Sequence, residues 1–104
     1  MKLLTKEITN KLPALGSMDG KDPQNVPVAV KFFCPWNQWT HYAIEGEQQE
    51  NGDWTFFGWV HGDFSELGYF NLSELESVTG PGGLKIERDR NFEGTLAEVM
   101  KAQI

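Results

Sequence analysis

The sequence predicts an α+β domain: a meandering antiparallel sheet of four to five strands, with an N-terminal helix, a short middle helix and a C-terminal helix packed against one face. β-rich runs fill the middle of the chain, helix-capping signals flank them, and segments rich in Gly and Pro separate the elements. A chain of 104 residues builds one hydrophobic core, so residues 1–104 are expected to form a single domain.

The first third of the chain predicts a helix, a loop and a strand. Thr5 is placed to cap a helix that Pro13 ends or distorts. The stretch 16–27 is rich in Gly, Asp, Pro and Asn, which is typical of a loop. Residues 26–34 carry apolar side chains at every even position, and Pro35 closes the run. This alternation predicts the first strand.

The centre of the chain predicts a hairpin and a further strand. Residues 39–45 and 54–61 are both β-rich, and the polar stretch 46–53 separates them. Two such runs are expected to pair as an antiparallel hairpin with a long loop. Residues 67–72 predict a fourth strand, so neighbours in sequence should be neighbours in the sheet.

The last third of the chain carries two capping-box patterns. Ser73 to Glu76 predicts a short helix through Val78, which the Gly-rich turn 79–83 ends. Residues 84–88 are expected to form a short edge strand. Thr95 to Glu98 predicts the start of the C-terminal helix. The buried stripe of that helix is expected to comprise Leu96, Val99, Met100 and Ile104.

The charge pattern argues against a nucleic-acid binder. The net charge is −6, and residues 32–84 contain no Lys or Arg but eight Asp and Glu. A phosphate-binding surface needs cations, so direct nucleic-acid binding is not expected. The cluster Lys85, Arg88 and Arg90 would be the only footprint for it.

The sequence also predicts a cytoplasmic protein. It contains neither the apolar run of a signal peptide nor the roughly 20 apolar residues of a membrane-spanning helix. No membrane association is therefore expected. Cys34 is the single cysteine, so an internal disulfide cannot form.

A transition-metal site would draw on the imidazole, thiol and carboxylate groups of the central runs: His41, His61, Cys34 and Asp63. None of these residues shows paired ligand spacing, so no metal or cofactor is assigned. Pairing His41 with Trp59 would put both histidines on one face, whereas pairing it with Gly58 would separate them. Cys34 lies on the apolar parity of its strand and is expected to be a buried, inert thiol, so no catalytic residue is assigned.

The aromatic side chains of the central runs are too numerous for one sheet face. They occur at both odd and even positions, so one face cannot bury them all. Helices over the second face would bury the excess. Otherwise the aromatics would form an exposed patch of the kind that marks an interface or a ligand groove. The candidate interaction residues are Trp36, Trp39, Trp54, Trp59, His41 and His61.

Several fragments of the sequence form a recognisable series in their order and spacing. They are Lys2-Leu3-Leu4-Thr5, Val30-Lys31-Phe32-Phe33, Pro35-Trp36, Trp39-Thr40, Thr55-Phe56-Phe57-Gly58, Glu66-Leu67-Gly68-Tyr69-Phe70, Leu72-Ser73-Glu74-Leu75-Glu76, and Ile86-Glu87-Arg88-Asp89 with Phe92. Together they resemble a bacterial family of proteins with a domain of unknown function, numbered 2958. The resemblance covers nearly the whole chain and implies a small cytoplasmic protein, often carried by plasmids and other mobile elements, with no assigned activity or catalytic residues.

Three hypotheses of function follow from these observations. The leading one is a non-catalytic protein-interaction module, linked to plasmid or mobile-element biology, that binds a protein partner or itself through exposed aromatics. The second is an acidic DNA mimic that inhibits a host DNA-binding protein. The third is a small metal-assisted hydrolase using His41 and His61. Enzymatic activity is the less favoured reading, because no nucleophile, base and orienting group can be assembled from the sequence.

Overall fold

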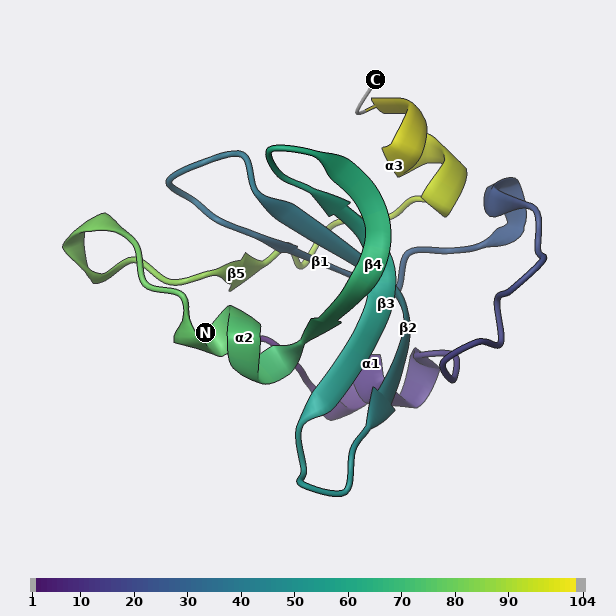
Figure 1. The fold of residues 1–104 in the computed structure, drawn as a ribbon, viewed down its shortest axis with the longest axis horizontal. Helices are drawn as coiled ribbons and strands as arrows, with labels where there is room; N and C mark the ends of the chain where they lie inside the picture. Colours follow the sequence, from purple (N-terminus) through teal and green to yellow (C-terminus); the bar gives the residue numbers. More distant parts are fainter. Residues whose placement is uncertain (1, 103–104) are drawn as a thin grey trace.

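The computed structural model describes residues 2–102, which form a five-stranded antiparallel sheet with three α-helices (Figure 1). The strands are β1 (Val30–Phe33), β2 (Thr40–Gln48), β3 (Trp54–His61), β4 (Ser65–Asn71) and β5 (Glu87–Arg88), in the spatial order β4-β3-β2-β1-β5. The helices are α1 (Lys6–Lys11), α2 (Leu72–Ser77) and α3 (Leu96–Ala102). The predicted α+β class and the meander from β1 to β4 are confirmed.

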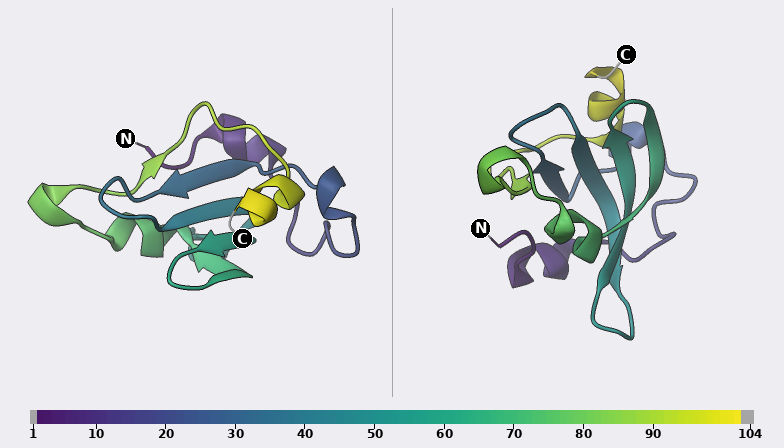
Figure 2. Two further views of the ribbon diagram at one scale, coloured as in Figure 1. Left: turned by 90° about the horizontal axis from the view of Figure 1, so that it is seen from above. Right: turned by 60° about the vertical axis from the view of Figure 1, so that its left-hand side comes forward.

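Apolar clusters lie on both faces of the sheet. On the first face, Phe32 and Phe56 are fully buried among side chains that include Ile8 of α1 and Leu75 of α2. On the second face, Tyr42 and Ile44 are buried beneath Leu96 and Val99 of α3. Figure 2 shows α1 and α3 well separated, with strands of the sheet between them. The prediction of helices against one face was therefore wrong, because α1 and α2 pack on the first face and α3 packs on the second.

The first strand is shorter than the alternation predicted. Val30 and Phe32 pack on the first face, but Val26 and Val28 belong to the cluster on the second face. The chain therefore changes sides before β1 begins at Val30. The segment ahead of β1 bonds to the C-terminal part of the chain instead: Val28 N–H donates to the Gly94 carbonyl at 2.9 Å. The prediction of a single strand over residues 26–34 was therefore wrong, since β1 comprises only Val30–Phe33.

The predicted caps of α1 and α3 are confirmed. Ile8 N–H donates to the Thr5 hydroxyl at 3.3 Å, and α1 ends at Lys11, ahead of Pro13. In α3, Thr95 N–H donates to Glu98 Oε1 at 3.0 Å and Glu98 N–H donates back to the Thr95 hydroxyl. Leu96 and Val99 are buried and Met100 is half-buried, while Ile104 lies outside the described residues.

The cap of α2 is Asn71 rather than Ser73. Asn71 N–H donates to Glu74 Oε1 at 2.9 Å, so the box closes two residues earlier than the Ser73–Glu76 pattern predicted. Both pairs satisfy the pattern, but β4 runs to Asn71 and leads directly into the helix. This places Glu74 in the first turn of α2, where a carboxylate is favourable to the helix dipole.

The connection between β2 and β3 is shorter than expected, because β2 continues to Gln48. Asp53, at the end of this turn, ties it to α2. Its carboxylate accepts from Ser73 N–H at 3.1 Å, from the Ser73 hydroxyl at 2.6 Å and from Trp54 N–H at 2.8 Å. The hydrogen bonds from Ser73 lower the pKa of Asp53. This carboxylate therefore satisfies one of the free N–H groups of the first turn of α2.

Across residues 2–102, no helix combines the length and the apolar character that crossing a bilayer requires.

Asp53→Asn is expected to lower the urea midpoint at neutral pH. Because the pKa of Asp53 is lowered in the folded state, the stabilisation is fully present above the ordinary Asp value of about 3.9 and is lost as pH falls through the lowered value. The difference between wild type and variant should therefore shrink in strongly acidic buffer. Asp63→Asn, at an exposed turn residue, is the matched control. A difference that stays constant from pH 7 to pH 2 would contradict the role given to this carboxylate.

Candidate functional site

The sheet register separates the two histidines. His41 of β2 pairs with Val60, and His61 of β3 pairs with Thr40. Because successive side chains of a strand point to opposite faces, His41 lies on the first face and His61 on the second. His61 Nδ1 lies 2.7 Å from the Ser65 hydroxyl. The two imidazoles therefore cannot bind one metal ion together, and residues 2–102 contain no group of three or more His, Cys, Asp or Glu arranged to hold one.

Three of the predicted interaction residues meet in one hollow at an end of the first face. This hollow, of about 380 Å³, is called the aromatic pocket below. The loop between β1 and β2, β2 itself, the end of β4, and α2 with the turn that follows it all contribute to its lining. The lining includes Trp36, Trp39, His41, Phe70, Glu74 and Val78.

Two glycines set the positions of the pocket tryptophans. A Cβ on Gly62 would overlap the ring of Trp39, and a Cβ on Gly80 would overlap the ring of Trp36. Each indole therefore lies directly against backbone that carries no side chain. The loop itself is closed by the Cys34 N–H, which donates to the Trp39 carbonyl at 3.0 Å. The tryptophans of the pocket are thus held by local packing.

His41 lies between two aromatic rings of the pocket. Its ring stacks on Trp39 at a centroid distance of 6.3 Å and meets the edge of Phe70 at 4.9 Å. Its Nδ1 atom is buried and has no hydrogen-bond partner among the described residues. Burial lowers the pKa of His41, and the Glu74 carboxylate partly opposes this shift. The imidazole is therefore neutral at neutral pH, with one nitrogen able to donate and the other able to accept.

Cys34 also lines the pocket, and its environment makes it a poor nucleophile. The side chain is buried, and burial raises the pKa of its thiol. Only the thiolate is strongly nucleophilic, so Cys34 is a protonated thiol at neutral pH. This agrees with the expectation of an inert cysteine on the apolar side of its strand.

The remaining candidate residues lie outside the aromatic pocket. Trp54 stacks on Phe56 at 6.5 Å and packs against the core of the first face. Trp59 is half-buried on the second face, where its indole N–H is buried without a partner among the described residues. His61 is on that second face as well. The six predicted residues therefore do not form one continuous patch.

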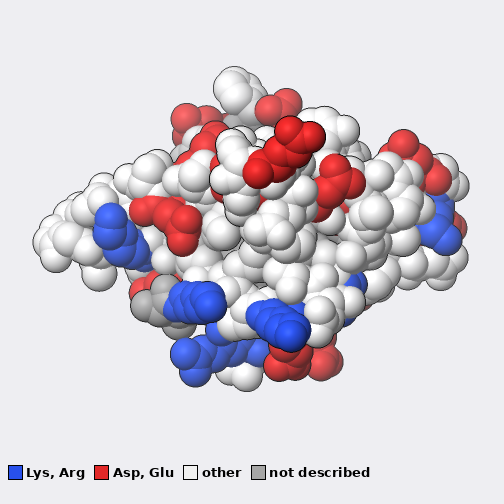
Figure 3. Space-filling model, turned by 90° about the horizontal axis from the view of Figure 1, so that it is seen from below, with Lys and Arg blue, Asp and Glu red and all other residues white. Residues whose placement is uncertain are grey.

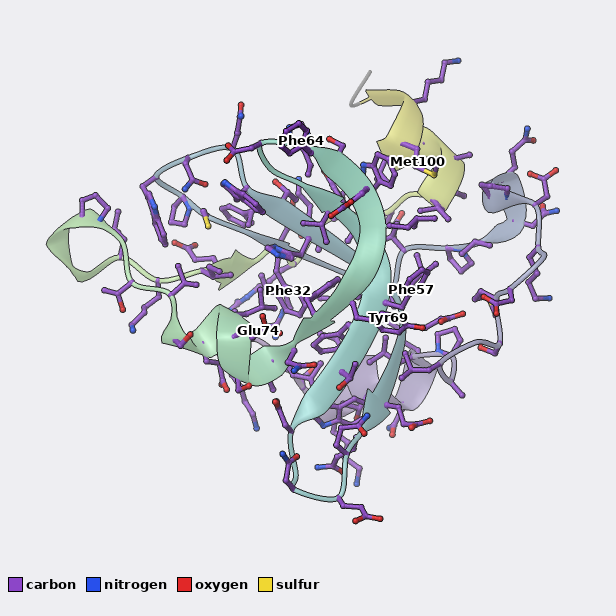
Figure 4. All side chains as sticks on the ribbon, in the orientation of Figure 1. Phe32, Phe57, Phe64, Tyr69, Glu74 and Met100 are labelled. Atoms are coloured by element: carbon purple, nitrogen blue, oxygen red, sulfur yellow. The ribbon has the colours of Figure 1, made fainter. Side chains whose placement is uncertain are left out.

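A second exposed surface was missed by the sequence analysis. It consists of Phe64, Leu67 and Tyr69, which are 84%, 43% and 71% exposed, and is called the β4 apolar strip below. Tyr69 contacts Phe57 of β3 at a ring distance of 4.8 Å, and Phe64 lies at the turn before β4 (Figure 4). Leu67 and Tyr69 occupy alternate positions of a strand, and this pattern usually predicts buried side chains. The sequence does not show that the strand lies at an edge of the sheet.

The cations are arranged differently from the predicted cluster. A hollow of about 330 Å³ between α1 and β5 is lined by Lys11, Lys31, Arg88 and Arg90 together with Glu7 and Asp89. Lys31 forms an ion pair with Asp89 at 3.6 Å, and Arg88 donates to the Lys2 carbonyl at 2.6 Å. Lys85 points elsewhere and donates to the Thr79 hydroxyl. On the face drawn in Figure 3, several Lys and Arg side chains gather toward the lower edge with carboxylates beside them, and further carboxylates lie above them.

An NMR titration tests the environment of His41. Its pKa is expected to lie below the ordinary value of about 6.5, because burial penalises the charged imidazole. Glu74→Gln should lower this pKa further, since the substitution removes the carboxylate that favours the imidazolium. Glu76→Gln, at an exposed residue of the same helix that does not line the pocket, should leave it unchanged. An ordinary pKa for His41, or equal shifts in both variants, would contradict this assignment.

Comparison with known proteins identifies the family without adding an activity. Neither a curated protein nor a solved structure matches the chain. A family model described as a protein of unknown function, DUF2958, matches residues 3–102, which is nearly the whole sequence. The chain therefore belongs to the DUF2958 family of proteins of unknown function.

Proposed function

We propose that the protein is a non-catalytic protein-interaction module whose contact site is the aromatic pocket. The observation that carries this proposal is the hollow of about 380 Å³ whose walls bring together the indole rings of Trp36 and Trp39 and the imidazole of His41. Aromatic walls around a hollow of this size are typical of a site that receives a side chain of a partner protein.

The composition of the pocket supports binding of a protein side chain. Tryptophan is enriched at the energetically dominant positions of interfaces, because its large ring buries much area at little entropic cost. Trp36 is half-buried and Trp39 is 37% exposed, so both rings have surface left to cover. A volume of about 380 Å³ accommodates a large side chain with its neighbouring backbone.

The chemistry of the lining favours binding over catalysis. Burial keeps the Cys34 thiol protonated, which leaves the pocket without an activated nucleophile. Most of the remaining lining is apolar or aromatic. The DNA-mimic hypothesis receives less support, because Lys and Arg side chains lie among the carboxylates on the face seen in Figure 3. The plasmid or mobile-element setting that the family resemblance implies is part of this proposal and would narrow the choice of partner.

Affinity capture from a lysate of the source cells tests the pocket, with the wild type and two folded variants compared by quantitative mass spectrometry. Trp39→Ala is expected to reduce enrichment of the partner about tenfold or more, since truncation of a central interface aromatic costs about 2 kcal/mol. Phe64→Ala removes a more exposed aromatic outside the pocket and should not change it. Two outcomes would refute the pocket as the contact site: the partner is still enriched with Trp39→Ala, or Phe64→Ala reduces its enrichment as much as Trp39→Ala does.

Self-association through β4 is a second candidate for the interaction. β4 is an edge strand of the sheet, so one side of its backbone has no neighbouring strand. The β4 apolar strip lies on and beside this edge, with Tyr69 largely exposed. An exposed apolar edge is a ready template for pairing with another strand. The occupant that fits this edge is β4 of a second copy, which would extend the sheet across a two-fold axis.

Light scattering coupled to size-exclusion chromatography tests self-association. The mass of the wild type is expected to rise toward that of a dimer with concentration. Tyr69→Lys should remain monomeric, because a lysine on the edge disfavours pairing. Gln24→Lys adds the same charge at an exposed residue away from β4 and should behave as the wild type does. A wild type that stays monomeric at every concentration would exclude this mode.

A further inference from the structure

The charged side chain in the lining of the aromatic pocket is a carboxylate. Its lining contains the carboxylate of Glu74 and no Lys or Arg side chain. The pocket is built mainly from the segment 32–84, which has no cation in its sequence. The nearest cation in sequence, Lys85, holds its ammonium group on the Thr79 hydroxyl at 2.7 Å, at the margin of the pocket. The pocket therefore offers an anionic and aromatic surface to a ligand.

We infer that the aromatic pocket binds a cationic side chain of the partner, namely the guanidinium group of an arginine. This inference rests on the proposed function and specifies the chemistry of its ligand. A cation is attracted to the face of an indole ring, and arginine stacks on aromatic rings more often than lysine does. Trp36 supplies such a ring in the lining, and Glu74 supplies the opposite charge. The ring of Trp39 lies against Gly62 and stacks on His41, so it forms a wall of the pocket.

The acceptor groups of the pocket match a planar donor. A guanidinium carries five N–H donors and no acceptor, and a carboxylate only accepts. The carboxylate in the lining is that of Glu74, which is exposed. A bound guanidinium would also favour the neutral imidazole of His41, which burial already favours. The ligand would thus match both the acceptor and the electrostatics of the site.

Glu74 can take part while it keeps its structural role. One oxygen, Oε1, accepts from Asn71 N–H and thereby closes the cap of α2. A carboxylate has about four lone-pair sites on its two oxygens, so acceptor capacity remains for a guanidinium. The cap also holds the side chain in place, which reduces the entropy lost on binding. Glu74 is exposed, so its substitution is compatible with folding.

NMR titration with short Gly/Ser peptides tests the inference, because the probe is a single defined side chain. One peptide carries arginine, a second carries citrulline, which has the same shape without the charge, and a third carries phenylalanine. The indole N–H signals of Trp36 and Trp39 and the ring signals of His41 report binding. The arginine peptide is expected to bind about tenfold more tightly than the citrulline peptide, the ratio that one charge-assisted hydrogen bond provides.

Two variants separate charge from shape. Glu74→Gln retains an oxygen for the Asn71 cap, and it should weaken arginine binding about tenfold while leaving citrulline binding unchanged. Glu76→Gln makes the same change on the same helix outside the pocket and should have no effect. Arginine binding should also lower the pKa of His41, because a second cation beside the ring disfavours the imidazolium.

Several outcomes would overturn the inference. Equal affinity for arginine and citrulline, stronger binding of phenylalanine, or no binding of the arginine peptide at millimolar concentration would each do so. The capture experiment distinguishes this failure from that of the proposed function. A partner that is lost with Trp39→Ala but retained with Glu74→Gln would leave the pocket as a contact site and exclude a cation as its ligand. A partner retained with both variants would exclude the contact site itself.

Discussion

The covering of the second face of the sheet depends on the β-bulge at Ile44 in β2. Ala43 and Glu45 pair with the consecutive residues Gly58 and Phe57, so Ile44 is the extra residue. The bulge puts Ile44 and Glu45 toward the second face. Glu45 is 2% exposed, and its two carboxylate oxygens accept from the backbone N–H groups of Gly16 and Met18 at 2.8 Å each. This buried carboxylate fastens the loop after α1 over a face that has only the short α3 to cover it.

The aromatic pocket follows from the way the opposite face is closed. The core of that face is filled by Phe32, Phe56 and Phe70, whose rings lie 5.6 and 5.5 Å apart in series. Beyond Phe70 the margin of this face is formed by α2 with its following turn and by the loop that carries Trp36 and Trp39. Because Gly62 and Gly80 carry no side chain, the indoles of Trp39 and Trp36 lie directly against the backbone and form walls of the pocket beside His41.

Local signals in the sequence predicted the helices and strands well. Features that depend on contacts between distant segments could not be predicted. The residues Thr5 and Thr95 cap helices as expected, because capping depends on side chains three residues apart. The β3 strand has the predicted bounds, 54–61. The position of His41 relative to His61 depends on pairing register, which periodicity does not specify. The side change between Val28 and Val30 was likewise invisible, since alternation of apolar residues looks the same whichever face each half of a run contacts.

The site required knowledge that only the fold supplies. Three of its residues were candidates from the start, but Glu74 was not, because a surface carboxylate in a capping pattern indicates a helix start and nothing more. His41 has a buried nitrogen without a partner among the described residues, as Trp59 does, and burial cannot be inferred from one residue type in one strand. An apolar ring at position 41 would pack between Trp39 and Phe70 without the cost of an unpaired polar atom. The interpretation of the pocket as a binding site therefore depends on its aromatic walls, its volume and the carboxylate of Glu74, and not on this one nitrogen atom.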